Sequence, residues 1–251
     1  MRSLAITNQK GGVGKTTTAV NLAACLAMEG TRVLLIDLDP QGNATTGSGV
    51  DKLKLNASVY QLLLGLRKLE EVKLVTEFGY ELLPANRDLG GAEVELIEMD
   101  RREYRLRDAL QNNTDKYDVV LLDCPPALNL LTLNGLVAAD AVLIPMQCEY
   151  YALEGLSDLV ATLRKVRANL NPNLEIEGLL RTMYNPQSML TKQVSTELES
   201  HFGNKVYQTM IPRNVRLAEA PSYGKPVTSY DMKSRGSQAY IDLSKEVMAR
   251  L

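Results

Sequence analysis

Apolar residues occur along this chain in short runs that alternate with longer stretches of helical spacing. Several runs are continuously apolar, a pattern typical of strands in a parallel sheet that is covered on both faces. Strands are predicted at 3–8, 32–38, 80–84, 118–124, 141–146, 176–183 and 206–211. Helices are predicted at 15–29, 91–99, 103–112, 129–138, 151–170, 189–202 and 236–250.

This alternation predicts an α/β fold, doubly wound, with a mostly parallel sheet and helices on both faces. The sequence contains no internal repeat, low-complexity tract or linker, so residues 1–251 are expected to form one domain. Segment 42–79 is the least regular part of the chain. We expect it to be an insertion over the ligand-binding edge of the sheet.

The stretch QKGGVGKTTT (9–18) lies between the first predicted strand and the first predicted helix. In a phosphate-binding loop, glycines let backbone N–H groups converge on a phosphate, and the helix that follows adds the positive end of its dipole. Gln9 stands where the usual pattern begins with glycine, and Lys10 is an additional cation. The residues expected to cradle phosphates are Gly11, Gly12, Val13 and Gly14.

The next three residues carry the side chains that nucleotide chemistry requires. Lys15 is expected to bridge the β- and γ-phosphates, and the Thr16 hydroxyl to bind Mg²⁺. Thr17 can donate a hydrogen bond to the α-phosphate. The loop therefore predicts a nucleoside triphosphate with Mg²⁺ as its ligand.

Three aspartates follow two of the predicted strands. Asp37 and Asp39 end the second strand in DLDPQGN, and Asp123 ends an apolar strand before Pro125 and Pro126. In an open α/β sheet, ligands lie at the carboxyl ends of the strands. We expect Asp123 to lie near Mg²⁺, Asp37 to bind a metal-bound water and Asp39 to order the attacking water. The alternative is that Asp37 and Asp39 only cap the strand.

The composition limits the other possibilities. Net charge is −2, so any contact with DNA must come from a local basic patch. His201 is the only histidine, which argues against a histidine-based metal site or triad. The cysteines are few and scattered, as expected for buried thiols in a reducing cytosol: Cys25, Cys124 and Cys148. No signal segment or apolar run of ~20 residues occurs, so a cytoplasmic protein without a membrane span is expected.

The motifs QKGGVGKTTT, DLDPQGN, LLDCPP and IPRNVRLAEAP occur in that order, and over its whole length the chain resembles the ParA/Soj partitioning ATPases. These belong to the deviant Walker A group, which includes MinD. The resemblance implies that ATP drives a homodimer in which Lys10 reaches the phosphates of the partner's ATP. It also implies that Pro212 and Asn214 contact the adenine; from the residues alone, these two could equally be a turn and a helix N-cap.

The resemblance further implies non-specific binding to double-stranded DNA, association with the nucleoid, and hydrolysis stimulated by a ParB/Spo0J-type centromere-binding protein. Residues 203–238 contain six basic and two acidic residues, whereas the rest of the chain contains 22 basic and 28 acidic ones. Family members often carry an arginine where this chain has Gln187, and a merely solvated basic face is the alternative. The expected DNA contacts are Arg216 above all, with Arg213, Lys225, Lys233 and Arg235.

Three other functions would each require sequence features that differ from those of this chain. A MinD-like membrane-associated ATPase would end in a basic amphipathic tail, whereas here the apolar residues of the last helix have core-docking spacing: Tyr240, Leu243, Val247 and Leu251. A nitrogenase-reductase-like carrier would need cysteines that hold an iron–sulfur cluster, and the three cysteines do not lie in the corresponding segments. A non-enzymatic scaffold is contradicted by three nucleotide motifs in order. The sequence favours an ATPase that segregates chromosome or plasmid origins.

Overall fold

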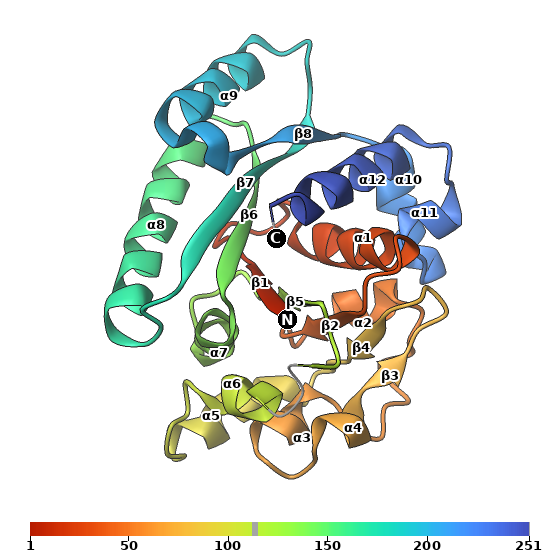
Figure 1. Ribbon diagram of the computed structural model, residues 1–251, viewed down its shortest axis with the longest axis vertical. Helices are drawn as coiled ribbons and strands as arrows, with labels where there is room; N and C mark the ends of the chain where they lie inside the picture. Colours follow the sequence, from red (N-terminus) through yellow and green to blue (C-terminus); the bar gives the residue numbers. More distant parts are fainter. Residues whose placement is uncertain (112–114, 251) are drawn as a thin grey trace.

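The computed structural model describes residues 1–111 and 115–250. Their eight strands form one sheet in the order β3-β4-β2-β5-β1-β6-β7-β8 (Figure 1). All pairs are parallel except β3 with β4, which are antiparallel. The strands are β1 (Arg2–Ile6), β2 (Val33–Asp37), β3 (Leu74–Val75), β4 (Glu81–Leu83), β5 (Val119–Asp123), β6 (Ala141–Gln147), β7 (Glu175–Tyr184) and β8 (Val206–Pro212).

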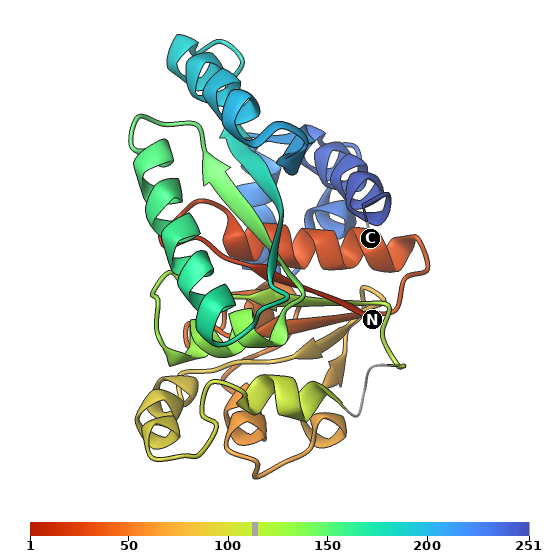
Figure 2. The ribbon, with the colours of Figure 1, turned by 60° about the vertical axis from the view of Figure 1, so that its left-hand side comes forward.

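Helices cover both faces of this sheet, as Figure 2 shows in a second view. One face carries α1 (Lys15–Met28), α2 (Asn43–Gly47), α10 (Val215–Glu219), α11 (Val227–Tyr230) and α12 (Arg235–Met248). The other carries α3 (Val59–Leu63), α4 (Leu69–Val72), α5 (Leu89–Ile97), α6 (Arg105–Leu110), α7 (Leu130–Ala138), α8 (Ala152–Asn169) and α9 (Met189–Phe202). This is the predicted doubly wound α/β fold.

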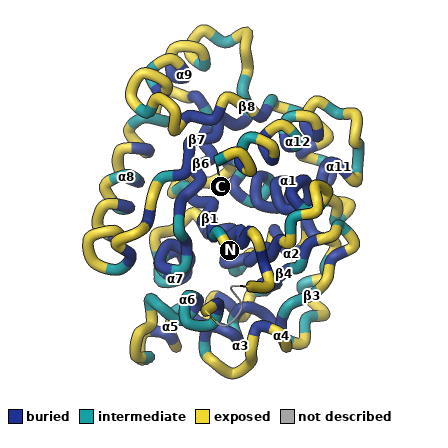
Figure 3. Tube along the Cα trace, in the orientation of Figure 1, coloured by how far each residue is buried: buried dark blue, intermediate teal, exposed yellow. Residues whose placement is uncertain are grey.

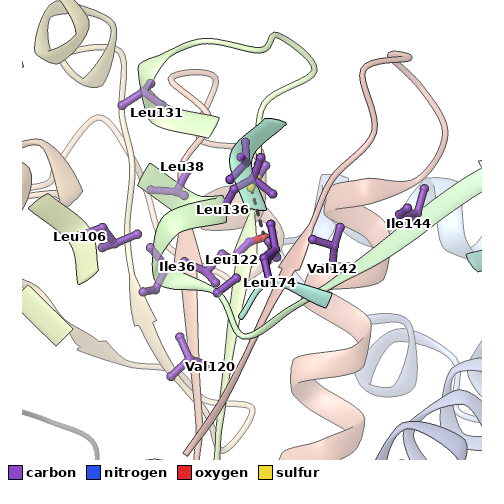
Figure 4. Packing of buried hydrophobic residues seen from close by; sticks show 14 of the residues in the cluster. Ile36, Leu38, Leu106, Val120, Leu122, Leu131, Leu136, Val142, Ile144 and Leu174 are labelled. Carbon is purple, nitrogen blue, oxygen red and sulfur yellow. Dashed lines mark hydrogen bonds between the residues drawn. The ribbon is translucent and has the colours of Figure 1, made fainter. Parts of the chain in front are cut away.

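The central strands are apolar throughout because each side of them meets a helix layer. In β5, Val120 and Leu122 pack into one core with Ile36 (Figure 4), while Val119 and Leu121 pack into the core on the opposite face. The residues of β5 are almost completely buried, and Figure 3 shows the centre of the sheet in dark blue. Each such side chain contributes about 1.5–3 kcal/mol of burial free energy.

All seven predicted strands and all seven predicted helices are present, with ends that differ by at most two residues. Residue 112 of one predicted helix lies outside the described part of the chain. Segment 42–79 was wrongly expected to be an insertion over the edge of the sheet. Only α2 lies there; α3 and α4 join the helix layer on one face, and β3 extends the sheet. These elements are short, so they produce no clear period in the sequence.

Helix α12 docks on the body of the protein, as the spacing of its apolar residues predicts. Tyr240, Leu243 and Val247 are buried, and the Tyr240 hydroxyl hydrogen-bonds the Thr18 hydroxyl of α1 at 3.1 Å. Leu251, the fourth residue of that pattern, lies outside the described residues. Among the described helices, none is long and apolar enough to cross a membrane.

Candidate active site

Parallel pairing brings the predicted site residues to one edge of the sheet. Asp123 is the register partner of Ile6 on β1 and of Asp37 on β2, so the carboxyl ends of these three strands lie side by side. The glycine-rich loop leaves β1 at this edge and enters α1 at Lys15. The motifs, which are up to about a hundred residues apart in sequence, therefore converge at one place.

The loop ends at a helix start that is open to an anion. Gly14 is the N-cap of α1, with φ 89° and no side-chain cap, and the first turn contains no acidic residue. Gly12 has φ 73°. Residues other than glycine rarely adopt this left-handed region, so these two positions require glycine. The uncapped N–H groups and the helix dipole favour a bound phosphate.

Lys15 is buried beneath the loop and only 7% exposed. Its Nζ donates a hydrogen bond to the carbonyl oxygen of Lys10 at 3.0 Å. Burial lowers the pKa of Lys15, while the nearby Asp123 and Asp39 carboxylates act in the opposite direction. The ammonium group is thus held between the loop and the carboxylates.

Asp37 is fully buried, and both of its carboxylate oxygens accept hydrogen bonds. One accepts from the backbone N and the hydroxyl of Thr45, each at 2.8 Å, and the other from the backbone N of Asp39 at 3.1 Å. Burial raises the pKa of Asp37 to about 6, although the bonds from Thr45 partly offset this rise. Asp37 therefore also anchors α2 to the end of β2.

Asp123 differs from Asp37, because neither of its buried carboxylate oxygens has a hydrogen-bond partner of normal geometry among the described residues. Burial raises its pKa well above the usual value, Asp37 adds to the rise, and the nearby Thr16 hydroxyl opposes it. A buried, unpartnered carboxylate is costly unless a cation compensates it. Carboxylate and hydroxyl oxygens suit Mg²⁺, so Asp123 and Thr16 fit the predicted ion. Within residues 1–111 and 115–250, no three acidic, cysteine or histidine side chains form a metal cluster.

Asp39 lies just beyond the end of β2, where the chain has already turned. It is partly exposed, and one carboxylate oxygen accepts a hydrogen bond from the backbone N of Gln41 at 2.9 Å. Asp39 is close enough to raise the pKa of both Asp37 and Asp123. It is thus the most accessible of the three aspartates at the site.

Lys10 does not point into its own loop. Its Nζ pairs with a carboxylate oxygen of Glu149 at 2.6 Å, and the two side chains are 50% and 51% exposed. Glu149 follows β6, 139 residues along the chain. The two lysines of the loop therefore have different surroundings, since Lys15 is buried and Lys10 remains at the surface.

A cavity of about 170 Å³ adjoins the loop. Asn214 lies in its wall and is also the N-cap of α10, because its side-chain oxygen accepts from the backbone N of Arg216 at 2.9 Å. The N-cap interpretation is confirmed, and the side-chain amide nitrogen has no hydrogen bond of its own to the described residues. The cavity is lined by Gly14, Thr17, Thr182, Met183, Ile211, Pro212, Arg213, Asn214, Leu217, Ala218 and Tyr240.

The five predicted DNA contacts are all exposed, but they lie in different surroundings. Arg213 belongs to the wall of the cavity just described, and Lys225 lines another of about 260 Å³ beside Thr16 and Thr17. Lys233 and Arg235 line a groove of about 470 Å³.

Arg216 is held in two ion pairs. Its guanidinium lies 2.8 Å from Glu219 and 3.3 Å from Asp231. Glu219 and Asp231 are the two acidic residues of segment 203–238, so both negative charges of the segment pair with the same arginine. Gln187 is exposed.

Several side chains at the site were missed by sequence reasoning. Thr45, Gln147, Glu149 and Thr182 each contact a predicted site residue. Gln147 and Thr182 could have been found from their position in the sequence, because both lie at the carboxyl ends of predicted strands. The three cysteines are free and buried, as predicted.

The fold and the glycine-rich loop define the class of this protein as a P-loop NTPase. The family described as AAA domain matches residues 1–176. The chromosome partitioning protein ParA of Caulobacter vibrioides is 53% identical, over 100% of this chain and 95% of its own. The sporulation initiation inhibitor protein Soj of Bacillus subtilis is 53% identical, over 98% of each chain.

A solved structure shares the whole architecture. Cobyrinic acid a,c-diamide synthase from Mycobacterium smegmatis, with bound ATP analogue and magnesium, is 40% identical with a TM-score of 0.86. The match covers 98% of this chain and 93% of that one. The chain belongs to the ParA/Soj family of chromosome-partitioning ATPases.

Proposed function

We propose that this protein uses ATP and Mg²⁺ to form a sandwich homodimer that binds DNA without sequence preference. Hydrolysis, stimulated by a ParB-type partner, releases the dimer and so segregates chromosome or plasmid origins from a position on the nucleoid. The observation that carries the proposal is the convergence of the loop, the buried Lys15 and the unpartnered Asp123 at one edge. The structure of a 40% identical relative with an ATP analogue and magnesium supports the choice of ligands.

In this proposal the loop and α1 bind the phosphates, and Lys15 contacts the β- and γ-phosphates. Thr16 and Asp123 would hold Mg²⁺, which would supply positive charge against the phosphates, and Asp37 would act through a water because its own oxygens are already hydrogen-bonded. Thr17 donates to the α-phosphate. The adenine enters the 170 Å³ cavity, where Pro212 is a flat apolar wall and the free amide nitrogen of Asn214 is a donor.

The position of Lys10 supports the proposed dimer. Its side chain is half exposed and directed away from its own loop, so it is available to the γ-phosphate of a second copy. Two copies related by a twofold axis would exchange lysines, and each lysine must leave Glu149 to do so. Loss of the γ-phosphate removes this attraction, so hydrolysis separates the copies.

Gly11→Val is expected to give a protein that binds ATP but stays monomeric. A Cβ built on Gly11 meets no atom within 4 Å, so the larger side chain fits the single chain. It would project from the loop into the proposed seam and hold the two copies apart. Light scattering with ATP measures the mass, and calorimetric titration of ATP is the control that the loop still works. An ATP-dependent dimer of this variant would show that the loop does not lie at the seam.

Arg216→Ala is expected to weaken ATP-dependent DNA binding by about tenfold, and to reduce the slope of log affinity against log salt by roughly two per dimer, because one phosphate contact is lost from each copy. Arg216 must exchange Glu219 and Asp231 for phosphates when DNA binds. Fluorescence anisotropy at several salt concentrations measures both quantities.

A matched control is Lys165→Ala, which removes an exposed positive charge from α8 on the opposite helix layer. It is expected to leave both quantities near the wild-type values. Equal DNA affinity for Arg216→Ala and wild type would place the DNA surface elsewhere, and a MinD-like role would then be tested by pelleting with vesicles and ATP.

A further inference from the structure

Two side chains from neighbouring strands hold consecutive carbonyl groups of the phosphate loop. Gln147, the last residue of β6, donates its Nε2–H to the carbonyl oxygen of Gly12 at 3.0 Å. Thr182 of β7 donates its hydroxyl to the carbonyl oxygen of Val13 at 2.8 Å. Gln147 and Thr182 are register partners in the β6–β7 pair, so the two donors lie next to each other. The loop is therefore fastened to the sheet through its backbone.

Because the peptide group is planar, these two hydrogen bonds also set the direction of the N–H groups that follow in the loop. In a planar trans peptide the C=O and the following N–H point in opposite directions. A carbonyl of Gly12 that is held by β6 turns the N–H of Val13 away from that strand. A carbonyl of Val13 that is held by β7 does the same for the N–H of Gly14. These two N–H groups belong to the loop turn expected to surround a phosphate.

We propose that Gln147 and Thr182 are positioning residues that aim the N–H groups of Val13 and Gly14 at the nucleotide phosphates. The inference rests on the proposed nucleotide binding and adds to it the groups that orient the loop. It also assigns a role to two residues that belong to no nucleotide motif of the chain.

The attachment point on β7 is buried and held by hydrogen bonds to its neighbours. Arg181, the residue before Thr182, is only 3% exposed, and its guanidinium donates to the Ser195 hydroxyl at 2.7 Å and to the Tyr207 carbonyl at 2.6 Å. These bonds tie β7 to α9 and β8. Thr182 itself is 2% exposed, so its hydroxyl has little freedom to leave Val13.

The same segment also lines the proposed base cavity. Thr182 and Met183 both belong to its wall, and the Thr182 methyl group lies 3.7 Å from the position of a Cβ on Gly14. Met183 has φ 49°, an uncommon conformation for a residue other than glycine, and its sulfur lies 2.8 Å from the Gln147 amide nitrogen. The residues that orient the loop thus also border the space for the base.

The test is a pair of substitutions at Thr182. Thr182→Val keeps the branched shape and removes the donor, so the Kd for MgADP is expected to rise about tenfold. Thr182→Ser keeps the hydroxyl and is expected to restore most of the affinity. In protein labelled with [¹⁵N]glycine, the Gly14 amide signal should move on addition of ADP in wild type and Thr182→Ser, and much less in Thr182→Val.

A purely structural role would lower the unfolding temperature of the free protein and leave the Kd unchanged, which would overturn the inference. Should Thr182→Val fail to fold, Gln147→Met repeats the test at a less buried position. The Kd of this variant for MgADP is also expected to rise. A Kd equal to that of the wild type would overturn the inference. Wild-type protein that binds no ADP would overturn the proposed function and this inference with it. Wild-type affinity in Thr182→Val would overturn this inference alone.

Discussion

Lys15→Ala is expected to reduce ATP affinity at least about a hundredfold, the largest effect on ATP affinity that any single change at the site should have. Lys15 is the buried cation of the site, and its ammonium lies near Asp123 and Asp39. Without it, the incoming triphosphate would meet carboxylates that only Mg²⁺ could compensate. Burial already lowers the pKa of Lys15, so the phosphates would also stabilise its charged form in the wild type.

The other lysine of the loop is the matched control. Lys10→Ala removes a side chain that pairs with Glu149 at the surface, so each chain should keep near wild-type ATP affinity while dimerisation is lost. Calorimetric titration of ATP and light scattering separate the two outcomes. Equal ATP affinity for Lys15→Ala and wild type would contradict the role assigned to Lys15.

Much of the fold could be predicted from the sequence because the strongest patterns are local. A run such as VVLLD in β5 can be stable only where both of its faces are covered, which already implies a parallel sheet between helix layers. That topology in turn places Asp37 and Asp123 at the edge where the loop leaves β1. The loop and its aspartates follow from motifs and topology together.

The remaining contacts depend on how distant strands pair. The bond from Thr182 to Val13 spans 169 residues, and the β6–β7 register that sets it shifts at an irregularity between Val142 and Leu143. No local pattern fixes that shift. The pairing of Lys10 with Glu149 likewise joins loops from two different strands.

The sequence also does not show which positive charges of the basic segment 203–238 are free to bind DNA. The net charge of residues 203–238 suggested a freely available patch. The structure instead pairs both acidic residues of the segment with Arg216, and four of the other five cations line two cavities and a groove. A sum of charges does not say which charges face each other. That arrangement decides how strongly DNA phosphates can compete with Glu219 and Asp231 for Arg216.

Asp39→Ala is expected to bind ATP and form the dimer, but to hydrolyse ATP about 10²–10⁴ times more slowly, the usual contribution of a group that positions or deprotonates the nucleophile. One Asp39 oxygen is hydrogen-bonded to the backbone of Gln41, and the side chain is partly exposed, so the carboxylate can accept a hydrogen bond from a water beside the γ-phosphate. Lys15 and Asp123 keep their side chains, although the charge of Asp39 no longer acts on them. Binding should persist because only the attacking water loses its orienting group.

The dimer of Asp39→Ala should also last longer than that of the wild type, since the γ-phosphate that holds it together is no longer removed and one repelling carboxylate is gone. Phosphate release gives the rate, and light scattering after ATP is diluted away gives the lifetime. Asp51→Ala is the control, because Asp51 is exposed and, among residues 1–111 and 115–250, it bonds only Leu53 and Lys54 in the loop after α2. It should hydrolyse ATP as the wild type does. If Asp39→Ala also kept the wild-type rate, the attacking water would have to be oriented by another residue.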